Sequence, residues 1–160
     1  MKVLFVCSGN TCRSAMCEAY FNALCRKNGA ERLHAESAGT GAWEGERASG
    51  SAIRTLQDLN ADIASHRARR LTARMTQEAD LIVVMTAAHR ERVLQLDPSA
   101  AEKTRLLGEY SGAAPHDIAD PFGGGLDVYS LCFADMKGPL DNLFEELNGL
   151  AGKHSTKSQE

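Results

Sequence analysis

The chain lacks an apolar run long enough to cross a membrane, which takes roughly 20 residues. Only five apolar residues separate Lys2 from Ser8, too few for the hydrophobic region of a secretory signal. The chain also lacks a surplus of either charge, because 18 Lys and Arg stand against 21 Asp and Glu, a formal net charge of −3 at pH 7. We therefore expect neither a membrane nor a nucleic acid as a partner.

Cysteines are few, and their arrangement excludes two common roles. There are five, an odd number, bunched near one end with none between Cys25 and Cys132. This is not a disulfide framework, and the spacing shows no paired ligands of the kind that bind zinc. We expect a protein of the reducing cytoplasm that holds no metal ion and no cofactor.

The rest of the composition is that of an ordinary globular protein. The 160 residues are 43% hydrophobic and 24% charged, which suits a single domain. We predict this domain over residues 1–150. Residues 151–160 are polar and lack periodicity, so we predict a flexible C-terminal tail. The arginine run at Arg67, Arg69 and Arg70 predicts a solvated face.

Apolar segments that predict strands alternate with segments of helical periodicity. The expected strands are residues 3–6, 33–37, 81–85 and 104–107. The expected helices are residues 14–27, 51–59, a helix capped by Thr86 that ends near residue 96, and residues 127–147. Gly149 is the predicted stop of the last helix, and Pro139 predicts a break or second start within it. The alternation predicts an α/β fold: a parallel sheet with helices on both faces and a ligand site at the carboxyl ends of the strands.

Residues 7–14, CSGNTCRS, join the first predicted strand to the first predicted helix. Gly9 and Asn10 suit the positive φ of a tight loop, in which successive backbone N–H groups can point at one anion. The helix start adds its positive dipole end, and Arg13 adds a bidentate fork for phosphate oxygens. These groups favour the thiolate form of Cys7, which is the nucleophilic form.

Two other interpretations of this segment are an inert cysteine and a nucleotide-binding P-loop. A cysteine that ends a buried strand is often only a small inert hydrophobe. Here an arginine follows six positions later at a helix start, with Gly and Asn between, and this combination favours a phosphate-binding loop. The nucleotide-binding P-loop fits less well, because it requires a lysine that the segment lacks.

Asp120 is the best candidate for the proton donor that phosphoryl transfer needs. It begins the glycine-rich segment DPFGGG, which follows the last predicted strand and should lie at the same edge of the sheet as Cys7. Taken alone, an Asp before a Pro indicates only a turn. Together with the loop at Cys7, it predicts a general acid.

The pattern C-x5-R-S near the N-terminus, with a distal Asp-Pro, resembles the low-molecular-weight protein-tyrosine phosphatase family from about Lys2 to Asn148. The segments SAGT at 37–40 and SHRAR at 65–69 also match. The resemblance implies a single-domain three-layer sandwich with a four-stranded parallel sheet in the order 2-1-3-4. It implies catalysis by Cys7, Arg13 and Asp120 through a phosphocysteine, with phosphorylated proteins or peptides as partners and inorganic phosphate as product.

The resemblance also assigns the residues around the loop. The phosphate-binding residues would be Ser8, Gly9, Asn10, Thr11, Cys12, Arg13 and Ser14. The loop would be held in shape by Asn10, Ser14, Ser37 and His66. A redox pair, Cys7 with Cys12, is implied as well, although Cys12 packed toward the core is the alternative.

Within the family, the details are more similar to the bacterial protein-arginine phosphatases. Thr11 stands where tyrosine phosphatases usually carry an aliphatic residue, and Phe122 where they commonly carry Tyr. Thr86 follows Met85, at the position where tyrosine phosphatases usually have an Asp, and His89 lies three residues later. Trp43, however, could serve as an aromatic wall for tyrosine. We therefore predict a specificity wall of Thr11, Trp43 and Phe122, with phosphoarginine favoured and phosphotyrosine as the alternative.

Two functions of other classes stay open. A thiol-linked arsenate reductase shares the loop, but it needs further cysteines to relay a disulfide, and none lies between Cys25 and Cys132. A non-enzymatic anion-binding domain would keep Gly9, Asn10 and Arg13. It would have no use for a nucleophile and an acid together.

Overall fold

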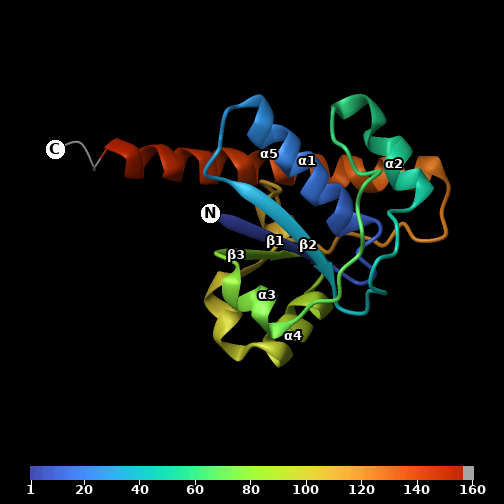
Figure 1. Ribbon diagram of the computed structural model, residues 1–160, viewed down its shortest axis with the longest axis horizontal. Helices are drawn as coiled ribbons and strands as arrows, with labels where there is room; N and C mark the ends of the chain where they lie inside the picture. Colours follow the sequence, from blue (N-terminus) through green and yellow to red (C-terminus); the bar gives the residue numbers. More distant parts are fainter. Residues whose placement is uncertain (157–160) are drawn as a thin grey trace.

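The computed structural model of the chain describes residues 1–156. A four-stranded parallel sheet in the order β2-β1-β3-β4 forms its centre (Figure 1). Its strands are β1 (Lys2–Cys7), β2 (His34–Gly39), β3 (Leu81–Val84) and β4 (Thr104–Leu106). The α/β class and the strand order 2-1-3-4 are thus confirmed.

Helices cover both faces of the sheet and complete three layers (Figure 1). One face carries α1 (Arg13–Lys27), α2 (Gly50–Leu56) and α5 (Leu126–Thr156). The other carries α3 (Ala73–Glu78) and α4 (Ala87–Leu96). Short 3₁₀ turns link these elements at η1 (Gln57–Leu59), η2 (Pro98–Lys103) and η3 (Leu107–Tyr110).

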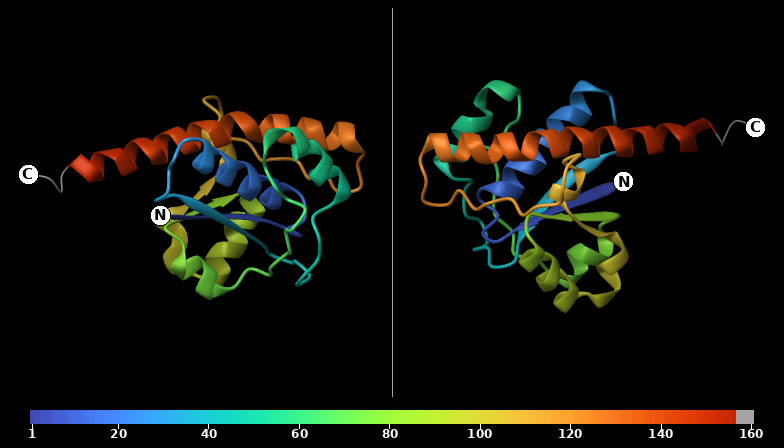
Figure 2. Two further views of the ribbon diagram at one scale, coloured as in Figure 1. Left: turned by 45° about the horizontal axis from the view of Figure 1, so that its top comes forward. Right: turned by 180° about the vertical axis from the view of Figure 1, so that it is seen from behind.

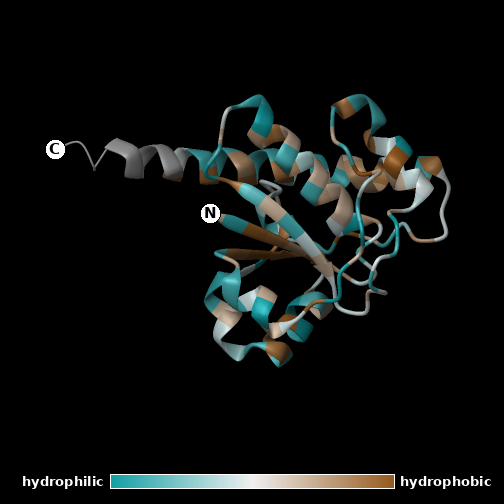
Figure 3. Ribbon diagram, viewed as in Figure 1, coloured by the Kyte–Doolittle hydropathy of each residue, from teal (hydrophilic) through white to brown (hydrophobic). Residues whose placement is uncertain are grey.

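The strands are apolar on both faces because both faces are covered. In β1, Val3 and Phe5 belong to the core beneath α1 and α5, whereas Leu4 and Val6 belong to the smaller core beneath α3 and α4. In Figure 3 the central strands are hydrophobic, whereas hydrophilic and hydrophobic residues alternate along the helices. Fully burying one such side chain contributes about 1.5–3 kcal/mol, so the continuous apolar runs dictate where the sheet forms.

Most predicted elements are present, with ends shifted by one or two residues. The predicted helix 51–59 is instead α2 up to Leu56, followed by the 3₁₀ turn η1. The short helix α3 was not predicted, because its six residues are too few to show a helical period. Thr86 caps α4 as predicted, accepting from the His89 backbone N–H at 3.2 Å.

The predictions for the end of the last helix were wrong. α5 continues through Pro139 and Gly149 as far as Thr156. A proline disfavours helix in the residue before it by a clash with that residue's Cβ, and Gly138 has no Cβ. A glycine inside a helix costs only about 1 kcal/mol. Of the predicted tail, residues 151–156 continue α5 and residues 157–160 lie outside the described residues.

The views in Figure 2 show α5 running along the whole α1 side of the sheet, so that its first turns lie near the carboxyl ends of the strands. Two backbone bonds tie the loops together at this edge. Thr40 N donates to Cys7 O at 2.9 Å, and Ile118 N donates to Met85 O at 2.9 Å.

Among residues 1–156, no helix has the length and apolar character of a membrane span.

Candidate active site

The loop after β1 curls tightly before α1 begins at Arg13. Asn10 adopts the left-handed region, with φ 58°, as predicted. Gly9 does not have a positive φ, so that part of the prediction was wrong; a Cβ at Gly9 would only contact Thr11 Oγ1 at 3.7 Å. The loop therefore needs one left-handed residue, and the polar side chain of Asn10 serves there because local hydrogen bonds can hold it.

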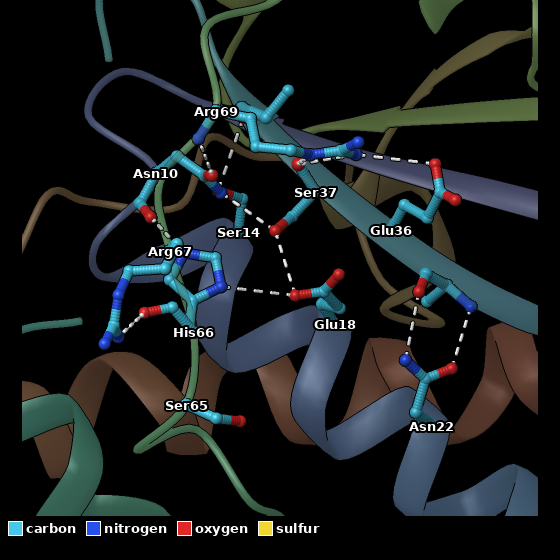
Figure 4. Close-up of polar contacts among 12 residues, drawn as sticks. Asn10, Ser14, Glu18, Asn22, Glu36, Ser37, Ser65, His66, Arg67 and Arg69 are labelled. Carbon is cyan, nitrogen blue, oxygen red and sulfur yellow. Dashed lines mark hydrogen bonds and ion pairs between the residues drawn. The ribbon is translucent and has the colours of Figure 1, made fainter. Parts of the chain in front are cut away.

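The side chain of Asn10 is fully buried and uses all its hydrogen-bonding groups (Figure 4). Its Nδ2 donates to Ser14 Oγ at 2.8 Å and to Ser37 Oγ at 2.9 Å. Its Oδ1 accepts from Arg69 N at 2.9 Å. A buried polar group with every partner in place has one favoured position, so the network fixes the left-handed turn.

Behind Asn10 lies a second layer that joins α1 to the segment at His66 (Figure 4). His66 Nε2 donates to the Asn10 carbonyl oxygen at 2.6 Å, and His66 Nδ1 lies 3.3 Å from Glu18 Oε2. Ser37 Oγ donates to the same Glu18 oxygen at 3.2 Å. The structure thus brings together the four predicted supporting residues, and adds Glu18, which the sequence analysis missed.

Two further residues near this network explain the fit of β2 against the loop. Arg67 and Arg70 are exposed, as predicted for the arginine run, and the Arg69 side chain is 39% exposed. Arg69 also has a structural contact, because its Nε and Nη2 donate to Ser37 O at 3.3 and 3.2 Å. Gly39 ends β2 where a Cβ would collide with Ser8 O and Asn10 N. The backbone can approach the loop this closely only at glycine, which gives the matched SAGT segment a physical reason.

Arg13 is buried, with 4% of its side chain exposed. Its Nη1 donates to Ile118 O at 2.8 Å, and its Nη2 lies 3.6 Å from Asp120 Oδ2. Its Nε has no hydrogen-bond partner, the one such buried side-chain nitrogen or oxygen among the described residues. Buried donors are normally paired, so this N–H marks a place for an acceptor that the protein itself does not supply.

Asp120 is held by the loop between η3 and α5, although it lies far from Arg13 in sequence. The Phe122 backbone N–H donates to Asp120 Oδ1 at 3.1 Å. Ile118, two residues earlier, is fully buried and bonded to both Met85 and Arg13. These contacts anchor the loop while the Asp120 carboxylate stays half exposed, free to meet a bound molecule.

All five cysteines are free thiols, and two of them, Cys7 and Cys12, belong to the loop segment 7–14. Cys7 Sγ lies 2.8 Å from Ser14 Oγ, and Cys12 Sγ lies 3.0 Å from Tyr129 OH. Burial raises the pKa of Cys17 well above its ordinary value, and burial raises the pKa of Cys132 to about 12. Those two thiols are therefore neutral at pH 7.

A cavity of about 390 Å³ opens over this loop. The predicted site residues in its wall are Cys7, Ser8, Gly9, Thr11, Cys12, Arg13, Trp43, Asp120 and Phe122. Trp43 and Phe122 stand at the mouth, about four-fifths exposed. The cavity thus gathers a thiol, a guanidinium and a carboxylate beneath an aromatic rim, an arrangement suited to binding and transferring a phosphoryl group.

The wall also contains residues that the sequence analysis did not assign to the site. These residues are Thr40, Gly41 and Glu46, of which only Glu46 carries a charge. No sequence signal distinguished Glu46 from any exposed acid. Among the described residues, no three His, Cys, Asp or Glu side chains form a group that could hold a metal ion.

Comparison with known proteins gives one consistent match. The family model described as low molecular weight phosphotyrosine protein phosphatase matches residues 2–151. A protein-arginine-phosphatase of Geobacillus stearothermophilus is 34% identical over 91% of this chain and 95% of its own length. A low molecular weight protein-tyrosine-phosphatase of Streptomyces coelicolor is 37% identical over 94% of this chain and 98% of its own.

A solved structure agrees with the sequence matches. An arginine phosphatase in which serine replaces the active-site cysteine and is phosphorylated superimposes with a TM-score of 0.86 at 31% identity. It covers 92% of this chain and 95% of its own. At this identity and coverage the likeness extends to the family as well as the fold.

Proposed function

Because the chain belongs to the low molecular weight phosphotyrosine protein phosphatase family, we propose that it hydrolyses phosphorylated protein side chains, phosphoarginine in preference to phosphotyrosine, through a phosphocysteine. Phosphatase activity itself follows from the family. Its relatives include both arginine and tyrosine phosphatases, so the preferred residue must be argued from the cavity itself.

One observation carries the proposal: the unpartnered Nε of buried Arg13, in the wall of the cavity that also holds Cys7 and Asp120. A phosphoryl oxygen is the acceptor that this donor lacks, and an arginine fork binds two such oxygens at once. The loop N–H groups and the start of α1 add further positive field. A phosphoryl group bound there would have its phosphorus beside the Cys7 sulfur.

The reaction would take two steps. In the first, the Cys7 thiolate attacks phosphorus, the bond to the leaving nitrogen or oxygen breaks, and Asp120 gives its proton to the leaving group. In the second, the Asp120 carboxylate takes a proton from water, whose oxygen attacks phosphorus as the sulfur–phosphorus bond breaks. Inorganic phosphate leaves. The phosphorylated active-site serine of the arginine phosphatase variant supports a covalent intermediate at this position.

The preference for phosphoarginine rests on the wall of the cavity. Thr11, Glu46 and Asp120, which carry a hydroxyl and two carboxylates, line the cavity. A guanidinium carries positive charge and N–H donors that these oxygens can accept, whereas a phenyl ring offers them nothing. Two relatives named protein-arginine-phosphatase, at 34% and 31% identity, support the same preference, whereas the tyrosine phosphatase of Streptomyces coelicolor is 37% identical.

Phosphotyrosine is the second candidate, and Trp43 is the observation that favours it. Its exposed ring at the cavity mouth could stack against a phenyl group. Measuring kcat/KM side by side on two peptides that differ only in the phosphorylated residue tests the proposal. A higher value for phosphoarginine is expected, and a higher value for phosphotyrosine would reverse the assignment.

The Thr11→Ile variant is expected to shift the ratio of kcat/KM from phosphoarginine toward phosphotyrosine by about tenfold. The substitution removes one hydrogen bond to a charged group and adds apolar surface in the wall. Thr11→Val is the matched control for the added bulk, because it removes the hydroxyl and keeps the branch. An unchanged ratio in both variants would show that Thr11 does not set specificity.

Reversible inactivation by peroxide is expected to depend on Cys12. Peroxide would convert the Cys7 thiolate to a sulfenic acid, and the Cys12 thiol would displace water from it to form a disulfide. Both thiols line the same cavity. Without the Cys12 thiol, further peroxide would oxidise the sulfenic acid to a sulfinic acid, which dithiothreitol does not reduce. After excess peroxide and then dithiothreitol, the wild-type protein and Cys132→Ser should regain activity, while Cys12→Ser should stay inactive. Full recovery of Cys12→Ser would contradict this role and leave Cys12 as a packing residue bonded to Tyr129.

A further inference from the structure

His89, the third residue of α4, links two loops at the carboxyl edge of the sheet. It is buried, with 5% of its surface exposed. Its Nε2 lies 2.8 Å from Ser8 Oγ, in the loop after β1, and its Nδ1 lies 3.2 Å from Thr86 N, at the start of α4. The two bonded positions, Ser8 and His89, are 81 residues apart in the sequence.

The contacts of the ring decide which nitrogen carries the proton. The backbone N–H of Thr86 can only donate, so Nδ1 must accept and is unprotonated. The Thr86 hydroxyl, 3.1 Å from the same nitrogen, can then only donate to it. Burial, and after it the positive charge of Arg13, lower the pKa of His89 to about 4, so the ring is neutral at pH 7. The single proton of the ring therefore lies on Nε2, which donates to Ser8 Oγ.

This bond leaves the Ser8 hydroxyl proton free. Ser8 follows Cys7 and lines the cavity, and among the described residues its Oγ has no hydrogen-bond partner other than His89. Since the ring donates to the hydroxyl oxygen, the hydroxyl proton must be given to another acceptor. A phosphoryl group beside Cys7 would present several oxygen acceptors in the same cavity.

We propose that His89 is a positioning residue for phosphate binding: its Nε2–H bond to Ser8 Oγ turns the Ser8 hydroxyl into a donor to one oxygen of the bound phosphoryl group. The inference rests on the proposed function, because it takes the loop at Cys7 to be the phosphate site. It goes beyond that function by adding a side-chain donor to the backbone N–H groups and Arg13. His89 itself does not touch the substrate.

A double-mutant cycle tests the coupling, with Kd for inorganic phosphate measured by calorimetry on folded protein. Ser8→Ala is expected to bind about tenfold more weakly, the effect of one hydrogen bond to a charged group. His89→Leu is expected to bind roughly 3–10-fold more weakly, and the double variant no more weakly than Ser8→Ala. His89→Gln keeps an N–H near the place of Nε2 and should regain most of the affinity.

Two results of the cycle would overturn the proposal. One is wild-type phosphate affinity in Ser8→Ala. The other is an equal loss from His89→Leu with and without Ser8, which is what a merely structural role predicts, since local loosening would weaken binding in both backgrounds.

A second test uses the wild-type protein alone, so it does not depend on whether a variant folds. The ring nitrogens of His89 can be assigned by nitrogen NMR, which is expected to place the proton on Nε2 at pH 7. A proton on Nδ1 would overturn the inference. These readouts do not depend on turnover: a wild-type protein that hydrolyses neither phosphopeptide would refute the proposed function, while the cycle and the ring spectrum would still decide the role of His89.

Discussion

The Cys7→Ser variant is expected to hydrolyse phosphorylated peptides at least about 10⁴-fold more slowly than the wild-type protein, because the nucleophile is lost. A serine hydroxyl has nearly the shape of the thiol, but it is not ionised at neutral pH. Arg13, Asn10 and the loop N–H groups are unchanged, so the fold and the affinity for inorganic phosphate should be retained. The measurements are kcat on both peptides, Kd for phosphate, and circular dichroism.

Cys25→Ser is the matched control for this experiment. Cys25 lies near the end of α1 and does not line the cavity, and burial raises its pKa to about 11, so it is a neutral thiol at pH 7. The control is expected to keep wild-type kcat. Turnover by Cys7→Ser comparable to that of the wild-type protein would remove Cys7 as the nucleophile, and loss of phosphate affinity in Cys7→Ser would point to a disturbed loop instead.

The Asp120→Asn variant is expected to lose roughly 10²–10⁴-fold in kcat on peptides, since an amide cannot give a proton to the leaving group. The loss should shrink on an aryl phosphate whose leaving group is stable as an anion and needs no proton. The amide keeps the size of the carboxylate and can still accept from Phe122 N, so the loop should hold its place. The measurement is kcat across aryl phosphates of graded leaving-group acidity.

Asp117→Asn, in the same loop, serves as the comparison for Asp120→Asn. Asp117 Oδ1 accepts from Ala87 N at 3.0 Å, a bond that the asparagine oxygen can also make, and Asp117 does not line the cavity. In the Asp117→Asn variant, the dependence of kcat on the leaving group should match that of the wild-type protein. If the Asp120→Asn substitution lowered kcat by the same factor for good and poor leaving groups, Asp120 would not be the general acid.

How much of this site the sequence predicts depends on the separation of the partners along the chain. The supporting network joins Asn10 to Ser37 across 27 residues and to the Arg69 backbone across 59. Glu18 and Arg69 take part only because β2 and the segment at His66 fold against α1. No local periodicity indicates such contacts, so a single sequence could supply Ser37 and His66 only through resemblance.

Two other predictions differ from the structure because neighbouring residues in the chain do not decide the outcome. Gly9 and Asn10 are equally suited to a left-handed turn, and only the hydrogen bonds of Asn10 in the folded protein choose between them. Gly149 is a stop signal when read locally, yet α5 continues through it because an interior glycine costs little when nothing else requires the helix to end.

Local sequence pattern alone predicts the continuous apolar strands, the helix starts at Arg13 and after Thr86, and the short loop from Cys7 to Arg13. These features depend on neighbours in the chain, so propensity and pattern encode them directly. The local pattern does not predict that Asp120 lies 3.6 Å from Arg13, that Glu46 lines the cavity, or that His89 bonds to Ser8. Those contacts form where a parallel sheet brings the carboxyl ends of its strands to one edge, and packing over long separations sets their distances.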